Sequence, residues 1–249
     1  MKIKILTQFP QMFAPVTSES ILKRAIDNGI LEVDVINIRD YSTDRHLKTD
    51  DTPFGGGAGM LMSCQSAFDA LKAAGADSKR SIYMSPRGRL LDQALIEELS
   101  KEEELVILCG HYEGVDQRII DAFGLEEVSI GDYVLTGGEL AAMVLIDSVS
   151  RLVPGVLGSE DSLSEESIYS GLLEYDQYTK PREYEGLSVP EVLTNGNHEL
   201  IHLWQFENSL RLTKERRKDL FERYLENHGK LSKKEQKILD EVVKEDWSE

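Results

Sequence analysis

Short apolar segments that end in glycine-containing loops and lead into helical patterns recur along the first part of the chain. Two of these loops, residues 109–114 (Cys-Gly-His-Tyr-Glu-Gly) and 129–138 (Ser-Ile-Gly-Asp-Tyr-Val-Leu-Thr-Gly-Gly), begin about twenty residues apart. Apolar runs of this kind are typical of buried parallel strands, and ligands of open α/β sheets collect at the carboxyl ends of such strands. The pattern therefore predicts an α/β fold and places the active site at these loops.

Strand-like and helix-like patterns alternate through the first 150 residues, as expected for β-α units around a parallel sheet. We expect strands at residues 2–7, 31–38, 81–84, 105–109 and 128–130, and helices at 18–28, 63–74, 92–100, 116–122 and 138–151. Serine and acidic residues then replace the apolar periodicity, which indicates a flexible acidic linker at residues 159–170. The sequence thus predicts an α/β domain over 1–158 and a small all-helical domain over 171–249, with helical patterns from about residue 198.

The composition limits the classes of protein that this chain can belong to. No apolar run reaches the length of a membrane span and no cleavable signal is visible, so we expect a cytoplasmic protein without a membrane segment. Two cysteines exclude a disulfide framework. The net charge of −17 argues against non-specific nucleic-acid binding. Local basic patches remain possible, because Arg211, Lys214, Arg216, Arg217 and Lys218 form a cluster.

Three other motifs compete with this interpretation. Residues 55–59 (Gly-Gly-Gly-Ala-Gly) lack the third glycine of a dinucleotide fingerprint and no strand directly precedes them, and the single Gly-Lys pair lacks the rest of a P-loop. His198, Glu199 and His202 match the H-E-x-x-H pattern of zinc hydrolases, with Glu222 as a possible third ligand. Against zinc, residues 195–197 (Asn-Gly-Asn) indicate a helix start there, where an acidic residue favours the helix dipole.

Several motifs together resemble one family over nearly the whole chain. They are residues 6–10 (Leu-Thr-Gln-Phe-Pro), 53–60 (Pro-Phe-Gly-Gly-Gly-Ala-Gly-Met), 109–116, 130–139, 151–158 (Arg-Leu-Val-Pro-Gly-Val-Leu-Gly), 171–174, 178–181 (Tyr-Thr-Lys-Pro) and 195–198 (Asn-Gly-Asn-His). In order and spacing the chain resembles the bacterial tRNA (guanine-N1)-methyltransferases of the SPOUT class. The resemblance implies a deep trefoil knot at the C-terminal end of the α/β domain, a homodimer with active sites between subunits, and methylation of guanosine 37 in the tRNA anticodon stem-loop.

The resemblance also implies S-adenosylmethionine as the methyl donor, bound in the knot by the strand-end loops. The matching residues, and hence the expected cofactor-binding residues, are Ser85, Pro86, Gly110, Tyr112, Glu113, Gly114, Ile130, Gly131, Asp132, Tyr133, Val134, Leu135, Gly137 and Gly138. Glycine at such positions lets a backbone approach a ligand closely.

Methylation at guanine N1 requires a base that removes the N1 proton and a positive group near O6. In the family these roles belong to an aspartate of the linker and to an arginine. Arg151 matches the arginine, whereas Glu166 stands at the position of the aspartate, and Asp161 and Glu165 are alternative proton acceptors. The family also implies Mg²⁺, although no metal-ligand spacing in this sequence indicates it, and we assign no metal ligand.

The resemblance places the loop with Asp50, Gly55, Gly56 and Gly57 near the target nucleotide, which must be exposed before its ring edge can react. We expect Arg216 and Arg217 to contact tRNA phosphates. Two alternatives besides the zinc hydrolase remain open: another knotted RNA methyltransferase that acts on the ribose 2′-hydroxyl, and an RNA- or partner-binding module without activity. The sequence does not reveal which tRNAs are accepted.

Overall fold

The computed structural model describes residues 1–157 and 171–245 of the 249-residue chain. The chain divides into two compact units, Met1–Gly158 and Ser159–Glu249, which are described separately. Among the described residues no helix is both long and apolar enough to cross a membrane.

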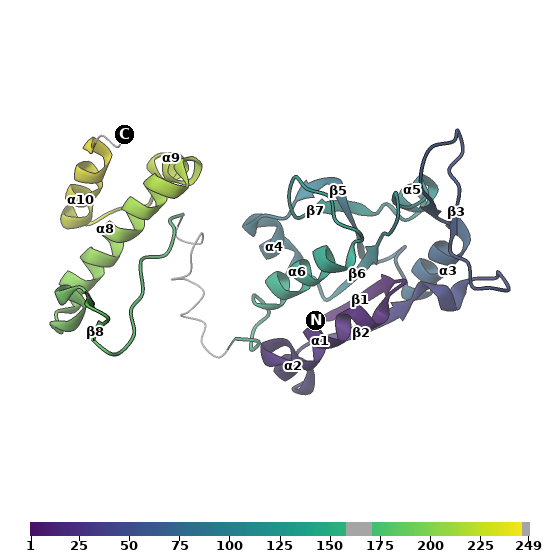
Figure 1. Ribbon diagram of the computed structural model, residues 1–249, viewed down its shortest axis with the longest axis horizontal. Helices are drawn as coiled ribbons and strands as arrows, with labels where there is room; N and C mark the ends of the chain where they lie inside the picture. Colours follow the sequence, from purple (N-terminus) through teal and green to yellow (C-terminus); the bar gives the residue numbers. More distant parts are fainter. Residues whose placement is uncertain (158–170, 246–249) are drawn as a thin grey trace. The chain divides into compact units, whose positions relative to one another are not determined.

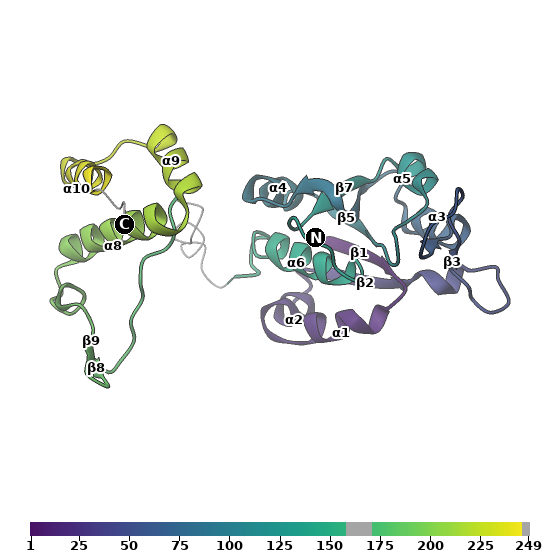
Figure 2. The same cartoon turned by 45° about the horizontal axis from the view of Figure 1, so that its top comes forward.

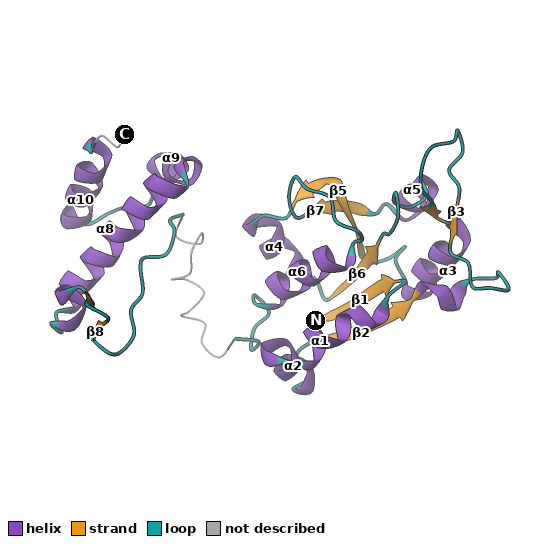
Figure 3. Ribbon diagram, viewed as in Figure 1, coloured by secondary structure: helices purple, strands orange, loops and turns teal. Residues whose placement is uncertain are grey.

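A five-stranded parallel sheet forms the centre of the first unit (Figures 1 and 3). Its strands lie in the order β2-β1-β6-β5-β7. They are β1 (Lys2–Thr7), β2 (Glu32–Asn37), β5 (Arg80–Leu90), β6 (Glu104–Cys109) and β7 (Glu126–Ser129). The α/β class with a parallel sheet, predicted from alternating apolar runs, is therefore confirmed.

Helices cover both faces of this sheet (Figure 2). One core cluster joins the sheet to α2 (Ser20–Asp27), α4 (Gln93–Leu99) and α6 (Glu139–Ser150), and the other joins it to α3 (Cys64–Ala74) and α5 (Gln117–Phe123). Burial on both faces explains why the central strand β6 is continuously apolar from Leu105 to Cys109 rather than alternating. The shorter elements are η1 (Pro10–Phe13), α1 (Ala14–Ser18), η2 (Ile38–Tyr41), β3 (Asp50–Asp51) and β4 (Leu61–Met62).

Local sequence signals explain where these helices begin and end. The Asp92 and Asp116 side chains cap α4 and α5 by accepting hydrogen bonds from the backbone N–H groups of Leu95 and Arg118. Gly75 and Gly124 terminate α3 and α5 in the left-handed conformation, at φ 79° and 57°. Aspartate before the first turn and glycine after the last turn are residue types typical of helix starts and stops.

The largest departure from the predicted elements is β5, which was expected at residues 81–84 and continues to Leu90. Its pairing with β7 shifts between Met84 and Arg89, so both Met84 and Arg89 lie opposite Val128. Residues 85–88 therefore bulge out of the ladder before the chain rejoins the same neighbour. Proline and glycine in this segment hid the second half of the strand from a pattern-based prediction.

The described part of the second unit contains α8 (His198–Arg216), α9 (Lys218–Asn227) and α10 (Lys233–Lys244). Leu172, Leu210, Phe221, Leu239 and Val242 form its small core. A capping box of Ser232 and Glu235 starts α10. Beside the helices lie η3 (Glu191–Thr194) and a hairpin of β8 (Glu183–Tyr184) and β9 (Leu187–Ser188), which the helical patterns did not predict.

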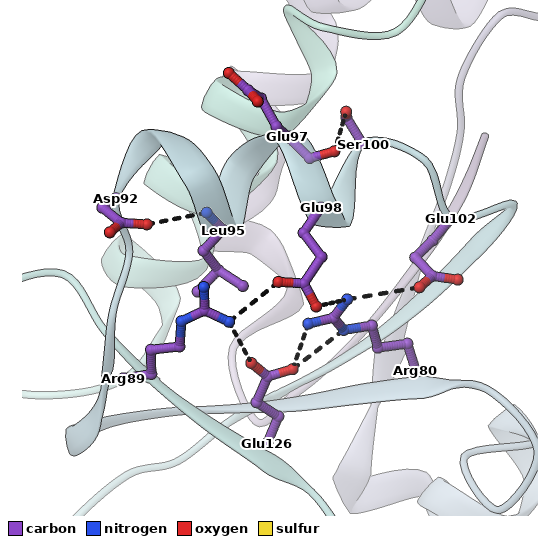
Figure 4. A network of polar contacts seen from close by, with 9 residues as sticks. All are labelled: Arg80, Arg89, Asp92, Leu95, Glu97, Glu98, Ser100, Glu102 and Glu126. Carbon is purple, nitrogen blue, oxygen red and sulfur yellow. Dashed lines mark hydrogen bonds and ion pairs between the residues drawn. The ribbon is translucent and has the colours of Figure 1, made fainter. Parts of the chain in front are cut away.

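A network of charged side chains fixes α4 to the edge of the sheet (Figure 4). Arg80, at the start of β5, contacts Glu126 of β7 at 2.8 Å and Glu98 of α4 at 2.8 Å. Arg89, beyond the bulge, contacts Glu98 at 3.1 Å. The two halves of β5 thus share the same carboxylates. Burial opposes the charge on Arg80, but its hydrogen bonds to Glu126 and Glu98 outweigh it and raise the pKa of the guanidinium.

We expect Arg80→Gln to lower the free energy of unfolding by about 1–2 kcal/mol, because Glu98 and Glu126 would face each other without their shared cation. Denaturant titration followed by circular dichroism measures this change. Lys23→Gln is the control, since Lys23 makes one exposed pair with Asp27 and its loss should change little. Equal stability losses in the two variants would contradict the role of the network.

Candidate active site

A pocket of about 470 Å³ opens at the carboxyl ends of β5, β6 and β7. This volume lies within the range of small-molecule sites. Its walls come from the bulge of β5, from the loop after β6 and from the loop between β7 and α6. The three loops that the sequence singled out therefore converge on one cavity in the first unit.

All of the expected cofactor-binding residues except Asp132, which is exposed, line this pocket. The residues that do so are Ser85, Pro86, Gly110, Tyr112, Glu113, Gly114, Ile130, Gly131, Tyr133, Val134, Leu135, Gly137 and Gly138. The lining also contains residues outside the expected cofactor-binding set, including Tyr83, Arg87, His111, Gln117 and Thr136, of which sequence reasoning gave no indication for Tyr83 and Gln117. His111 and Thr136 lie inside the quoted motifs, so their positions were available as a signal.

Backbone contacts bring the loops after β6 and β7 directly together. The N–H of Gly138 donates to the carbonyl of Gly110 over 2.8 Å, and His111 forms an isolated antiparallel bridge with Gly137. A Cβ on Gly138 would lie 3.0 Å from both the Cys109 Cα and the Gly110 nitrogen. Glycine at this position permits the approach, and no larger residue fits without displacing backbone.

Tyr83 closes the pocket beneath Gly110. A Cβ on Gly110 would lie 2.7 Å from Cε2 of the Tyr83 ring and 2.8 Å from its hydroxyl. Burial, with a smaller contribution from the charge of Glu127, raises the pKa of the Tyr83 phenol, which therefore stays protonated at neutral pH. Burial likewise raises the pKa of the Cys109 thiol, and the charge of Glu139 adds to this effect. Neither the Tyr83 phenol nor the Cys109 thiol is therefore activated as a base or nucleophile.

The bulge of β5 is held against β7 by both side chain and backbone. The Arg87 guanidinium donates to both carboxylate oxygens of Glu127 at 3.1 Å. A Cβ on Gly88 would lie 2.2 Å from the backbone carbonyl carbon of Glu127, so the backbones of β5 and β7 are in close contact there. Ser85 and Pro86 consequently have a fixed position at the pocket rim.

The predicted tRNA-contacting loop connects β3 and β4, with Asp50 in β3 and Gly55, Gly56 and Gly57 in the turn, all three at positive φ. These three glycines do not line the pocket. The base of the hairpin does adjoin it, because the Glu113 N–H donates to the Met60 carbonyl and the Met62 N–H donates to the Gly114 carbonyl, at 3.0 and 2.9 Å. The hairpin is thus anchored to the pocket loop while its tip extends beyond it.

Comparison with known proteins identifies the family of this chain. The model of the family described as tRNA (Guanine-1)-methyltransferase TrmD matches residues 1–223. The chain belongs to this family. It is 57% identical over 224 residues to a tRNA (guanine-N(1)-)-methyltransferase of Ruminiclostridium cellulolyticum, covering 89% of this chain and 96% of the relative. Relatives of the same name from Clostridium perfringens and Clostridioides difficile are 55% and 51% identical, over 96% and 90% of this chain and 99% and 98% of their own lengths.

Within this TrmD-family chain, Arg151 does not lie at the pocket. It is the residue after the last turn of α6, whereas the pocket lies at the first turn, around Gly138 and Ala141. The twelve residues of α6 span about 18 Å at the usual rise per residue. The expected catalytic arginine and the pocket of the same subunit are therefore separated by the length of a helix. Glu166, with Asp161 and Glu165, lies outside the described residues.

The second unit presents the predicted tRNA-binding arginines at the junction of α8 and α9. Arg216 is the last residue of α8, and Arg217 pairs with Asp219 at 2.6 Å. This ion pair lowers the pKa of Asp219 to about 2. Part of the positive charge of Arg217 is thus balanced within its own unit.

The zinc alternative gains no support from the second unit. His198, Glu199 and His202 occupy the first turns of α8, where Asn197 caps the helix, and Glu199 pairs with Lys234 at 2.6 Å. Within residues 1–157 and 171–245, no three His, Cys, Asp or Glu side chains lie close enough to hold a metal ion.

Proposed function

We propose that this protein transfers a methyl group from S-adenosylmethionine to N1 of guanosine 37 in tRNA. The observation that carries the proposal is the convergence of three strand-end loops on one pocket in a chain of the TrmD family. The relatives that align along almost their entire length are named tRNA (guanine-N(1)-)-methyltransferases, which supports this reaction class.

The pocket fits a nucleoside methyl donor in both size and lining. Apolar groups of Ile130, Leu135 and Ala141 stand beside the hydroxyls of Ser85 and Thr136 and the backbone amides of glycine-rich loops. Such a lining suits an adenine ring and ribose better than a highly charged phosphate. When bound, S-adenosylmethionine supplies an electrophilic methyl group. The loop residues named above hold and orient it, and Tyr83 and Val128 exclude water from the base of the pocket.

Two further residues are proposed to act on the guanine. N1 carries a proton at neutral pH, so a carboxylate must accept it, and negative charge then gathers on O6. Glu166 is the proposed acceptor, with Asp161 and Glu165 as alternatives, and the Arg151 guanidinium stabilises the charge on O6. Linker acids of this kind are also the proposed ligands of the Mg²⁺ that the family resemblance implies.

The position of Arg151 supports a homodimer with shared sites. Because α6 separates Arg151 from the pocket of its own subunit, the arginine reaches a methyl donor most simply when a partner subunit supplies the pocket. A twofold axis then creates two equivalent sites. The deep trefoil knot that the family resemblance implies at the C-terminal end of the α/β domain belongs to the same proposal.

The second unit and the β3–β4 hairpin are the proposed tRNA contacts. In this proposal Arg216 and Arg217 bind phosphates of the anticodon stem-loop, and the hairpin, with Asp50 in β3 and the glycine-rich tip, closes over the exposed base.

Incubation of the purified protein with tRNA and isotopically labelled S-adenosylmethionine should place the label on 1-methylguanosine at position 37. Nucleoside analysis by mass spectrometry, with a tRNA carrying adenosine at position 37 as control, tests both the atom and the site. Label on a ribose 2′-oxygen would instead identify the chain as another type of knotted methyltransferase.

Glu166→Gln should reduce kcat at least about a hundredfold, because an amide cannot accept the N1 proton. Affinity for S-adenosylmethionine, measured by calorimetry, should not change. Asp161→Asn and Glu165→Gln are matched controls from the same segment. If one of these abolishes turnover while Glu166→Gln remains active, the proton acceptor is that residue and not Glu166.

Arg151→Ala and Gly138→Ala should each inactivate the homodimer, the first by removing the cation and the second by displacing backbone at the pocket. Co-expressed with different tags, the two variants should form mixed dimers that contain one intact site, so random pairing should restore about a quarter of the wild-type activity. Mixed dimers that form but remain inactive would show that Arg151 serves its own subunit.

A further inference from the structure

Glu139 is a buried carboxylate to which the proposed reaction assigns no role. Only 1% of the residue is exposed, and it is the first residue of α6, directly after Gly137 and Gly138. A carboxylate at such a depth destabilises a fold unless polar partners surround it. Placement in the first turn of a helix favours its negative charge.

The two oxygens of this carboxylate face different elements. The Thr7 hydroxyl, at the end of β1, donates to Oε1 over 2.7 Å, and Nε2 of His111, in the loop after β6, lies 3.3 Å from Oε2. The Thr7 hydroxyl also accepts from the Phe9 N–H at 2.9 Å. Glu139 therefore connects the start of α6 to β1 and to the pocket loop of residues 110–114.

The contact between Glu139 and His111 also explains why residue 137 is a glycine. A Cβ there would lie 2.4 Å from Nε2 of His111 and 2.5 Å from Oε2 of Glu139. The imidazole and the carboxylate thus occupy the space that any other residue would fill. Gly137 also forms the bridge to His111, so one small region holds the backbones of both pocket loops.

The loop of residues 110–114 requires such support because its conformation is unusual. Tyr112 adopts φ 60°, a left-handed value that costs energy in a residue with a side chain. His111 stands at the centre of the loop, with its ring centroid 4.6 Å from that of Phe9 and 5.6 Å from that of Tyr112. It lines the main pocket and also a smaller one of about 150 Å³ on its other side.

We propose that Glu139 is a positioning residue that, through His111, holds residues 110–114 in the shape that binds the methyl donor. The inference rests on the proposed function for the identity of the ligand, but not for the ordering of the loop. Thr7 fixes the carboxylate, the carboxylate fixes the imidazole, and the imidazole fixes the backbone that lines the pocket.

Hydrogen exchange of the free protein tests the ordering without any ligand. In Glu139→Leu, the amides of Glu113 and Gly114, which donate to Met60 and His111, should exchange at least about tenfold faster than in the wild type. Glu104→Gln is the matched control, a glutamate at the opposite end of β6 that pairs with Lys4 and Lys79. Unchanged exchange in a folded Glu139→Leu protein would overturn the proposal.

Calorimetry with S-adenosylmethionine tests the consequence for binding. Glu139→Leu and His111→Phe should each weaken affinity by about tenfold, and the double variant by about the same factor, because both break one linkage. Glu139→Gln should recover most of the affinity, since the amide oxygen still accepts from Thr7 and the amide NH2 can donate to Nε2 of the neutral imidazole of His111. The KM for tRNA should not change in any variant. Effects that multiply in the double variant would refute action through His111.

Circular dichroism of each variant tests whether it is folded. If Glu139→Leu does not fold, the single variant His111→Phe replaces it in the exchange measurement. A wild-type protein that fails to bind S-adenosylmethionine would refute the proposed function. The exchange result would still decide whether Glu139 orders the loop.

Discussion

The contact between the backbones of Gly110 and Gly138 determines the site. An N–H to carbonyl hydrogen bond of 2.8 Å joins a loop that leaves β6 to the residue that precedes α6. A Cβ at residue 138 would lie 3.0 Å from backbone atoms of Cys109 and Gly110, so any side chain there would force the two segments apart. The pocket exists because these two segments, although distant in sequence, meet at the carboxyl ends of the parallel strands.

The same contact sets the direction of α6 and hence the separation of the two proposed chemical functions. The helix begins at the pocket and ends at Arg151, so one subunit offers a binding pocket at one end and a cation at the other. Its exposed Leu140 and Val144 lie one turn apart on the surface of this helix. An apolar strip of this kind is suited to burial against a second subunit that also brings an arginine to the pocket.

The sequence predicted the sheet and the three pocket loops because both depend on local patterns. Apolar runs bounded by glycine identify buried strands, and β1 has the predicted bounds. The second half of β5 could not be predicted from local patterns. Its renewed pairing with β7 depends on the close backbone contact between Gly88 and Glu127, which are distant in sequence. The burial of Glu139 could not be predicted for a similar reason, since a glutamate after Gly-Gly is typical of an exposed first helical turn. Only the contacts of its carboxylate with Thr7 and His111, from distant segments, account for its burial.

The second unit shows why a count of basic residues overstates the charge available for RNA. Of the cluster singled out in the sequence, Arg211 pairs with Glu207 and Glu245. Lys214 donates to the carbonyls of Val242, in the last turn of α10, and of Glu245, just after it. Arg217 faces Asp219, whereas within residues 171–245 Arg216 and Lys218 form no ion pair. Few phosphate contacts imply a shallow dependence of affinity on salt. Because the chain has a net charge of −17 and this cluster offers few phosphate contacts, we propose that tRNA is recognised mainly through its shape and the exposed base.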